Sequence, residues 1–302
     1  RYGILLTNGA ATNVVVANTI RSNDLYGIAI WGATSDSNRI TGNTIDGAAN
    51  RFQDSGVYLL SGDMNVVTNN IISRHALYGV YILSNAATNR IGWNRIFSNS
   101  RHGIFITNGA GPGAKYNVFA RNLVYRNMRA GIQLTAGTNN YFLNNVVYQN
   151  GSNGIKVGGT RTRTNKFYGN IVMSNGMTGV TNGPVAVQTH WNYNDVFGHA
   201  PNPDIRNVGA GAILAGQSNF NLFVNPMFSN TAATNFRLSG PTPLSPVVDE
   251  GTTNTLMAFD ATPVQGIFRD MGAYESAFAA SGGKYYINDV PDPMDNYTTA
   301  PG

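Results

Sequence analysis

Basic side chains in the middle of this sequence form its most promising group for chemistry. Lys156 follows Arg129 and precedes Arg161, and Tyr125 or His102 lies earlier in the same part of the chain. A lysine or tyrosine can remove the proton beside a uronic-acid carboxyl group, and arginines can stabilise the anion that develops. If the protein is an enzyme, the pattern predicts a polysaccharide lyase or epimerase, with Lys156, Arg129, Arg161 and Tyr125 in its catalytic site.

Paired acids, which glycoside hydrolysis requires about 5 to 9.5 Å apart, are not found where a hydrolase would need them. The positions expected to face outward after each repeated glycine hold tyrosines, leucines and Lys156, but no carboxylate. The acids of the first coils are scattered through expected corners and loops: Asp24, Asp36, Asp46, Asp54 and Asp63. The sequence therefore disfavours a hydrolase.

Metal ligands show no recognisable pattern either. The four histidines, His75, His102, His190 and His199, lack the spacing of a metal site, and the chain has no cysteine. The Ca²⁺-binding nonapeptide of some β-solenoids is also missing. No cofactor is predicted, and no motif supports Ca²⁺.

A repeat must position these residues, because the same two signals recur eight times along the chain. An Asn is followed two residues later by an aliphatic residue, and a Gly then opens a short β-type run. A second Asn lies five residues before the first in seven coils, and the period of 23 to 29 residues is typical of a solenoid. The Asn positions are Asn18, Asn43, Asn70, Asn94, Asn122, Asn145, Asn170 and Asn194, and the Gly positions are Gly3, Gly27, Gly56, Gly79, Gly103, Gly131, Gly154 and Gly179.

Each repeat contains three short alternating runs, after the earlier Asn, the later Asn and the Gly. Their inward positions hold β-branched or aromatic residues, such as Val67, Ile72 and Val57 in one coil. A leucine-rich repeat would need helix formers on one side of each coil, and none is present. We therefore predict an all-β, right-handed parallel β-helix with about eight regular coils, in which the repeated Asn side chains hydrogen-bond at the corners as structural residues.

The outer side of these coils is expected to be apolar. Tyr58, Tyr81 and Phe105 follow in successive coils with Trp31 beside them, and Ile71, Leu123, Val146 and Ile171 form a second outward row. Aromatic surfaces suit sugar rings, and contiguous apolar surface marks a partner site unless the protein's own chain covers it. Both alternatives remain open from the sequence. The predicted binding or interface residues are Trp31, Tyr58, Tyr81, Phe105, Arg129, Lys156, Arg161 and Arg163.

Composition and charge limit the partners. The 302 residues carry a net charge of +5, and only 12% of them are charged, a balance typical of extracellular β-solenoids. No apolar membrane span is present, and no motif for nucleic-acid binding accompanies the basic residues. An acidic polysaccharide or a solvated face explains the basic residues equally well. We expect a secreted protein, extracellular or at the cell surface.

Four stretches follow one another in the last third of the chain: NFNLFVNPMF (219–228), NFRL (235–238), SPVVDEG (245–251) and RDMGAYE (269–275). In this order they resemble DPLFV, FRL, SPAIDAG and DIGAYE, the closing segment of bacterial secreted right-handed parallel β-helix repeat proteins of the polysaccharide-lyase-like superfamily. The resemblance implies the fold and no particular activity, because the group includes lyase-like enzymes and surface proteins. It also implies structural roles for Asp249, Arg269, Asp270 and Glu275 in fixing the terminal coils.

These observations predict regular coils over 1–198, an irregular closing segment over 199–275, and a linker and tail over 276–302 that holds a possible exchanged strand. The first coil begins without an amphipathic cap, which favours head-to-tail association of copies or an upstream cap. We expect a secreted, non-catalytic structural or adhesive β-helix that self-associates and contacts acidic polysaccharide. The alternative is the polysaccharide lyase or epimerase.

Overall fold

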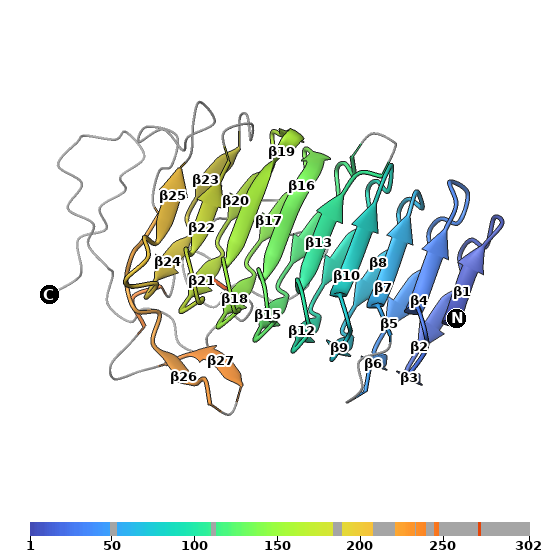
Figure 1. Cartoon of the computed structure of the whole chain (residues 1–302), viewed down its shortest axis with the longest axis horizontal. Helices are drawn as coiled ribbons and strands as arrows, with labels where there is room; N and C mark the ends of the chain where they lie inside the picture. Colours follow the sequence, from blue (N-terminus) through green and yellow to red (C-terminus); the bar gives the residue numbers. More distant parts are fainter. Residues whose placement is uncertain are drawn as a thin grey trace, which may run out of the picture.

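The computed structural model describes residues 1–48, 53–109, 113–183, 189–207, 221–232, 234–239, 245–247 and 271–272. Within them the chain contains strands and no helix, and it winds into three parallel sheets stacked coil upon coil (Figure 1). This is the predicted all-β solenoid of about eight coils. Asp249, Arg269, Asp270, Glu275 and the tail 276–302 lie outside the described residues.

Sheet A is the longest sheet and has nine strands. They are β1 (Tyr2–Thr7), β4 (Tyr26–Trp31), β7 (Ser55–Leu60), β10 (Tyr78–Leu83), β13 (Ile104–Thr107), β16 (Ile132–Thr138), β19 (Ile155–Arg163), β22 (Val180–Asn182) and β25 (Ile205–Asn207). Since β25 pairs with β22, sheet A continues past residue 198, where we expected the regular coils to end.

Sheets B and C have eight strands each, mostly of three residues. Sheet B contains β2 (Val14–Val16), β5 (Arg39–Thr41), β8 (Val66–Thr68), β11 (Arg90–Gly92), β14 (Val118–Ala120), β17 (Tyr141–Leu143), β20 (Lys166–Tyr168) and β23 (His190–Asn192). Sheet C contains β3 (Thr19–Arg21), β6 (Thr44–Asp46), β9 (Ile71–Ser73), β12 (Arg95–Phe97), β15 (Leu123–Tyr125), β18 (Val146–Tyr148), β21 (Ile171–Met173) and β24 (Asp195–Phe197). An antiparallel hairpin, β26 (Phe228–Asn230) and β27 (Asn235–Leu238), lies outside the three sheets.

Like residues stack on like residues inside the coils. The inward rows of isoleucine and valine are buried from the second coil to Val180 of β22, as in Ile28, Ile40 and Ile45, and Ile205 of the last strand is partly buried. In sheet B the rings of Phe119, Phe142, Phe167 and Trp191 stack at centroid distances of 4.7, 4.5 and 3.9 Å. Burial of this continuous column removes apolar surface from water along the whole axis and stabilises the stack.

The repeated Asn side chains form hydrogen-bonded ladders at the corners. Asn43 Nδ2 donates to Asn70 Oδ1 at 3.0 Å, and the same oxygen accepts the Asn43 backbone N–H at 2.9 Å. Asn43 Nδ2 also donates to the Val15 carbonyl of the preceding coil at 2.9 Å. The side-chain amides of Asn43 and Asn70 thus satisfy each other and two backbone groups that would otherwise be buried without a partner.

The ladders also hold an unusual backbone conformation. The residue before each later Asn has a positive φ, including non-glycine residues such as Trp93 at 59° and Arg121 at 54°. A left-handed conformation costs roughly 1 to 2 kcal/mol for such residues. The buried amide hydrogen bonds at the same corner offset this cost, so the Asn is needed for the turn itself.

Candidate functional site

An aromatic patch covers the outer face of sheet A in the first five coils. We define it as Tyr2, Tyr26, Tyr58, Tyr78, Tyr81 and Phe105. Tyr26 stacks on Tyr58 at 4.3 Å between ring centroids, Tyr58 lies 5.3 Å from Tyr81, and Tyr81 stacks on Phe105 at 5.6 Å. Burial in this patch raises the pKa of the Tyr81 phenol to about 12.

The exposure of these rings differs from the sequence-based expectation in one respect. Tyr58 faces outward but is only 6% exposed, because Tyr26 and Tyr81 lie against it. Tyr81 and Phe105 are half-buried, and Trp31 at the end of β4 is 44% exposed. Tyr58 therefore supports the surface, whereas Tyr81, Phe105 and Trp31 can contact a ligand.

Basic residues continue the same row of positions toward the C-terminal coils. The strand register aligns Tyr81 with Phe105, Phe105 with Gln133, and Gln133 with Lys156. Strands in such a sheet are about 4.8 Å apart, so aromatic and basic side chains follow one another at this spacing along the axis. The row thus runs parallel to the axis of the solenoid.

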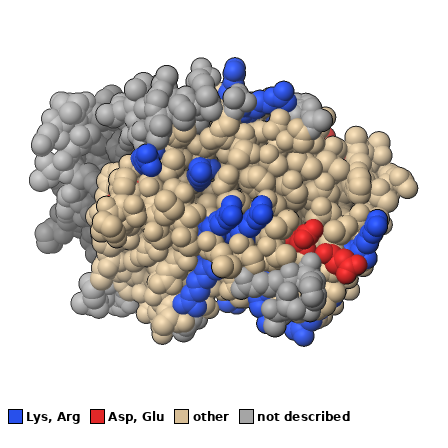
Figure 2. All heavy atoms as spheres, in the orientation of Figure 1, with Lys and Arg blue, Asp and Glu red and all other residues tan. Residues whose placement is uncertain are grey.

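Two arginines lie at the corner beside Lys156. The backbone N–H of Arg129 donates to the Arg101 carbonyl at 2.9 Å, which places the two residues in successive coils. Arg129, Lys156 and Arg101 all act electrostatically on His102, Arg129 most strongly. We call these three residues the basic patch. In the view of Figure 2, Lys and Arg side chains gather over the middle of the molecule, with acidic side chains toward the N-terminal coils.

His102 joins the two patches. Its ring stacks on Tyr78 at 5.8 Å and lies 5.3 Å from Phe105, while the charges of the basic patch act on it. Burial, followed by the Arg129 charge, lowers the pKa of His102 to about 4, and its Nδ1 atom has no hydrogen-bond partner. The ring is therefore neutral near pH 7, and its unpaired Nδ1 atom is buried.

The structure does not assemble the lyase site suggested by the sequence. Tyr125 belongs to sheet C, is 2% exposed and contacts Phe236 at 5.3 Å, so it faces away from Lys156 of sheet A. Arg161 and Arg163 lie at the far end of β19, beyond a bulge, and the register with β16 puts them about 10 and 17 Å along the strand from Lys156. Only Arg129 of the named partners lies near Lys156.

The second outward apolar row is covered by the chain itself. Leu123, Val146 and Ile171 of sheet C are at most 3% exposed, and they pack against Phe236, Leu238, Val247 and Met271. Figure 1 shows the β26–β27 hairpin beside sheet C. Of the two explanations left open by the sequence, intramolecular cover applies to this row from Leu123 onward. Ile71, nearer the N-terminus, remains 36% exposed.

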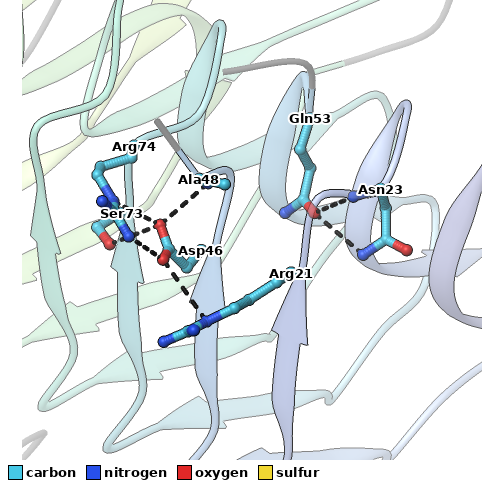
Figure 3. A network of polar contacts seen from close by, with 7 residues as sticks. All are labelled: Arg21, Asn23, Asp46, Ala48, Gln53, Ser73 and Arg74. Carbon is cyan, nitrogen blue, oxygen red and sulfur yellow. Dashed lines mark hydrogen bonds and ion pairs between the residues drawn. The ribbon is translucent and has the colours of Figure 1, made fainter. Parts of the chain in front are cut away.

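Acidic residues of the first coils serve the scaffold. Asp46 lies in β6, not in a loop, and pairs with Arg74 and with Arg21, whose Nε is 3.8 Å away (Figure 3). Burial opposes ionisation, but the Arg74 hydrogen bond and charge outweigh it, and the pKa of Asp46 is lowered. Asp36 and Asp63 are stacked rather than scattered, since Asp36 Oδ1 accepts the Asp63 N–H at 2.8 Å.

A third corner ladder was missed in the sequence. Asn99, Asn127 and Asn150 are linked by side-chain hydrogen bonds of 2.8 and 2.9 Å, and His75 Nδ1 lies 2.7 Å from Asn99 Oδ1. The signal was available, because these residues lie five positions after the later Asn. It was obscured because the rungs are not uniform: Asn23, Gln53, His75, Asn99, Asn127, Asn150, Asn175 and His199 occupy them.

Arg101, Tyr2, Tyr26 and Tyr78 of the two patches were also missed. Tyr26 and Tyr78 each lie directly before a repeated Gly, and strict alternation would give them the same side as the buried Ile28 and Val80. The structure instead places their rings against the outward Tyr58 and Tyr81, so the period-two rule misassigns them. Arg101 lies at a corner, where the period-two rule gives no direction. Its position follows only from the backbone pairing with Arg129.

The comparisons with known proteins agree with the fold. The profile of the family described as "Periplasmic copper-binding protein (NosD)" matches residues 2–200. The comparison with curated proteins gives no match.

Two solved structures have similar folds. The pectate lyase Pel9A is similar at 14% identity with a TM-score of 0.60, covering 87% of this chain and 72% of the lyase. A double mutant of the periplasmic alginate epimerase AlgG is similar at 20% identity with a TM-score of 0.50, covering 69% of this chain and 47% of the epimerase. The chain thus spans about half the length of that epimerase. At these identities the likeness shows the fold alone.

Copper is implied by the family description, and the donor set of the described residues does not fit it. The chain has no cysteine, and the rings of His75 and His199 are engaged in the third ladder. The described residues contain no group of three or more His, Cys, Asp or Glu side chains that could hold a metal ion. In the same residues, no helix is long and apolar enough to cross a membrane.

Proposed function

The chain belongs to the NosD family, and on the geometry of sheet A we propose that it is a non-catalytic β-helix of the cell envelope that binds an acidic polysaccharide. The observation that carries the proposal is the row Tyr81, Phe105, Gln133 and Lys156, which joins the aromatic patch to the basic patch. Aromatic rings favour the apolar faces of sugars, and Arg129, Lys156 and Arg101 favour carboxylate groups. A uronic-acid polymer lying along the axis of the solenoid would contact both the aromatic patch and the basic patch.

The same face argues for binding without cleavage. No carboxylate occupies an outward position on the described strands of sheet A, so the acid pair of a glycoside hydrolase is missing there. His102 has a pKa of about 4 and is 7% exposed, which makes it a weak and poorly accessible base. A surface that holds a polymer without cutting it acts as an adhesive or structural element.

The envelope location is supported by names of similar proteins. The family is described as periplasmic, and the epimerase AlgG is a periplasmic enzyme that acts on alginate. Pel9A is a pectate lyase. Polymers of this chemical class, which carry carboxylate groups along a sugar chain, match the basic patch.

The test is a binding measurement with polyuronate and with a neutral polysaccharide. We expect Arg129→Ala and Lys156→Ala to weaken polyuronate binding on the order of tenfold each, because a hydrogen bond to a charged group contributes about 1.5 to 3 kcal/mol. Added salt should weaken binding as well. The matched control is Arg163→Ala, an exposed arginine of the same strand outside the basic patch. Equal loss in all three variants, or equal binding of the neutral polymer, would contradict the proposal.

A lyase or epimerase is the second candidate. It is favoured because Lys156 is exposed on the outer face of sheet A and because Arg129 acts on the same residue, His102, as Lys156 does. In that reaction Lys156 would take the proton beside the carboxyl group, and Arg129 would stabilise the anion. The purified protein is incubated with polyuronate, and unsaturated product is followed by its absorbance. If cleavage occurs and Lys156→Ala leaves it unchanged, this assignment of the base is wrong.

A further inference from the structure

A buried carboxyl group lies where the closing segment meets sheet C. By closing segment we mean the described residues 221–232, 234–239, 245–247 and 271–272. Asp195, the first residue of β24, is 0% exposed and lies between Ile171 of β21 and Leu222 of the closing segment. Its Oδ1 accepts the Val224 N–H at 3.1 Å, and its Oδ2 has no hydrogen-bond partner.

The closing segment is held around Asp195 by a few backbone and side-chain contacts. Asn194 Nδ2 donates to Asn221 Oδ1 at 3.0 Å, which extends the second Asn ladder into the segment. Leu222 N–H donates to the Asn194 carbonyl at 2.7 Å, and Val196 N–H donates to the Leu222 carbonyl at 3.0 Å. Asp195 thus sits inside the first contact that the segment makes with the coils.

Apolar packing supplies most of the remaining attachment. Phe236, Leu238, Val247 and Met271 lie on Leu123, Val146 and Ile171. Gly272 donates its N–H to the Gly169 carbonyl at 2.7 Å, and a Cβ at Gly272 would come within 2.8 Å of Ile171. The segment and sheet C are therefore in close contact, and water does not screen the Asp195 side chain.

Few charges face Asp195 from the surrounding elements. Ile171 of β21 and the segment residues Leu222 and Val224 are uncharged. The field that acts on Asp195 comes from Asp204, before β25, whose carboxylate is 2.7 Å from His199 Nδ1. This field repels a second negative charge. An ionised Asp195 would be a buried carboxylate with one unpaired oxygen, which is costly.

We propose that Asp195 makes the closing segment a pH-controlled clamp on sheet C, which holds when Asp195 is protonated and loosens when Asp195 is ionised. The loosened state uncovers Leu123, Val146 and Ile171 as one apolar strip. The proposal is independent of polysaccharide binding, which concerns the outer face of sheet A.

The direction of the pH effect follows from the two states of Asp195. Burial, and then the charge of Asp204, raise the pKa of Asp195 in the closed state to about 7, although the Val224 N–H opposes the shift. In the open state the group is solvated, with a pKa of about 3.9. The stabilisation of the closed state is therefore full below about pH 4 and is lost as the pH rises through about 7.

Hydrogen exchange of residues 221–239 at about pH 5 and pH 7.5, corrected for intrinsic rates, tests the clamp. The opening equilibrium should increase by up to about a hundredfold between these values in the wild type. In Asp195→Asn the increase should disappear, because the amide cannot ionise. The sheet A strands 78–83 and 104–107 should keep their protection in both proteins. An equal increase in Asp195→Asn, or none in the wild type, overturns the proposal.

Two further variants complete the test. Asp24→Asn is the matched control, because Asp24 is an exposed acid of the first coil and should leave the increase unchanged. Asp204→Asn removes the nearby negative charge, so the pKa of Asp195 should fall and the increase should be complete at a lower pH. If Asp195→Asn does not fold, the Asp204→Asn variant provides the test. The clamp is contradicted if the opening equilibrium of this variant depends on pH in the same way as that of the wild type.

Discussion

The outer faces of sheets A and C look alike in the sequence and differ in the structure. Both have rows of apolar residues pointing away from the core. On sheet C the closing segment covers the row from Leu123 to Ile171, whereas on sheet A Trp31 remains 44% exposed and Tyr81 and Phe105 are half-buried. An outward apolar row in a solenoid is therefore not by itself a partner site, because a distant part of the same chain can occupy it.

The largest expected effect is a difference in stability: truncating a side chain on the outer face of sheet C should destabilise the fold more than truncating one on the outer face of sheet A. Leu123→Ala on sheet C should lower the free energy of unfolding by about 2 to 5 kcal/mol, because it leaves a cavity under the closing segment. Leu83→Ala on the half-buried outer side of sheet A should cost less than about 1 kcal/mol. Chemical denaturation of both variants measures the difference. Equal losses would mean that the faces are equally covered.

Acid should weaken the coils while it strengthens the closing segment. Burial lowers the pKa of His75 to about 4, although its hydrogen bond to Asn99 opposes the shift. The stability contributed by the neutral ring is present above about pH 6.5 and is lost as the pH falls through about 4, which amounts to roughly 3 kcal/mol.

His75→Asn tests this effect, since Asn occupies the equivalent rung at Asn99 and Asn127. Thermal unfolding of this variant should depend less on pH between about 6.5 and 4 than that of the wild type. The control is His190→Asn, at a half-exposed histidine of β23. If His75→Asn loses as much stability in acid as the wild type, His75 in the third ladder is not the source of the acid sensitivity.

Ligand binding should distinguish the faces more finely. Arg101→Ala is expected to weaken polyuronate binding on the order of tenfold, because it removes one charge of the basic patch. Leu83→Ala, close to the aromatic patch, and Arg163→Ala, outside the basic patch, serve as comparisons. Bound polymer should slow hydrogen exchange in residues 101–107 and leave residues 221–239 unchanged. Protection of the closing segment instead would place the ligand on sheet C.

The smallest effect is a change in one pKa. A bound polyanion offsets the positive field of Arg129, Lys156 and Arg101, so the pKa of His102 should rise by less than about one unit from its value of about 4. The pKa of His75 should remain at about 4, because burial, its hydrogen bond to Asn99 and the charge of Asp46 set it, and not the charges of the basic patch. Titration of the two rings by NMR compares them in one sample. Equal shifts would indicate a general effect of the polymer.

Local and periodic features could be read from the chain directly. The constant spacing of Asn13 and Asn18, repeated in later coils, determines the register, because a parallel stack aligns equivalent residues of successive turns. The inward positions follow from alternation within each strand, and all of the second-coil examples, Ile28, Ile40 and Ile45, are buried. The row of Tyr81, Phe105 and Lys156 follows from the same rule.

Features that depend on distant segments could not be read in this way. Tyr125 and Lys156 are 31 positions apart in sequence, and the assignment to different sheets puts them on different faces. The third ladder combines Asn with His75, His199 and the inserted Gln53. These residues form equivalent hydrogen bonds but are of different types, so no single repeated residue marks the ladder in the sequence.

The sequence alone thus determined the solenoid, its register and its core, because those depend on contacts between equivalent positions one coil apart. The tertiary structure decided which outer face is open. That choice depends on where the closing segment lies, and its contacts with Leu123, Val146 and Ile171 join residues far apart in the chain. Such contacts follow no repeat, and they are governed by the apolar surface that two distant segments can bury together.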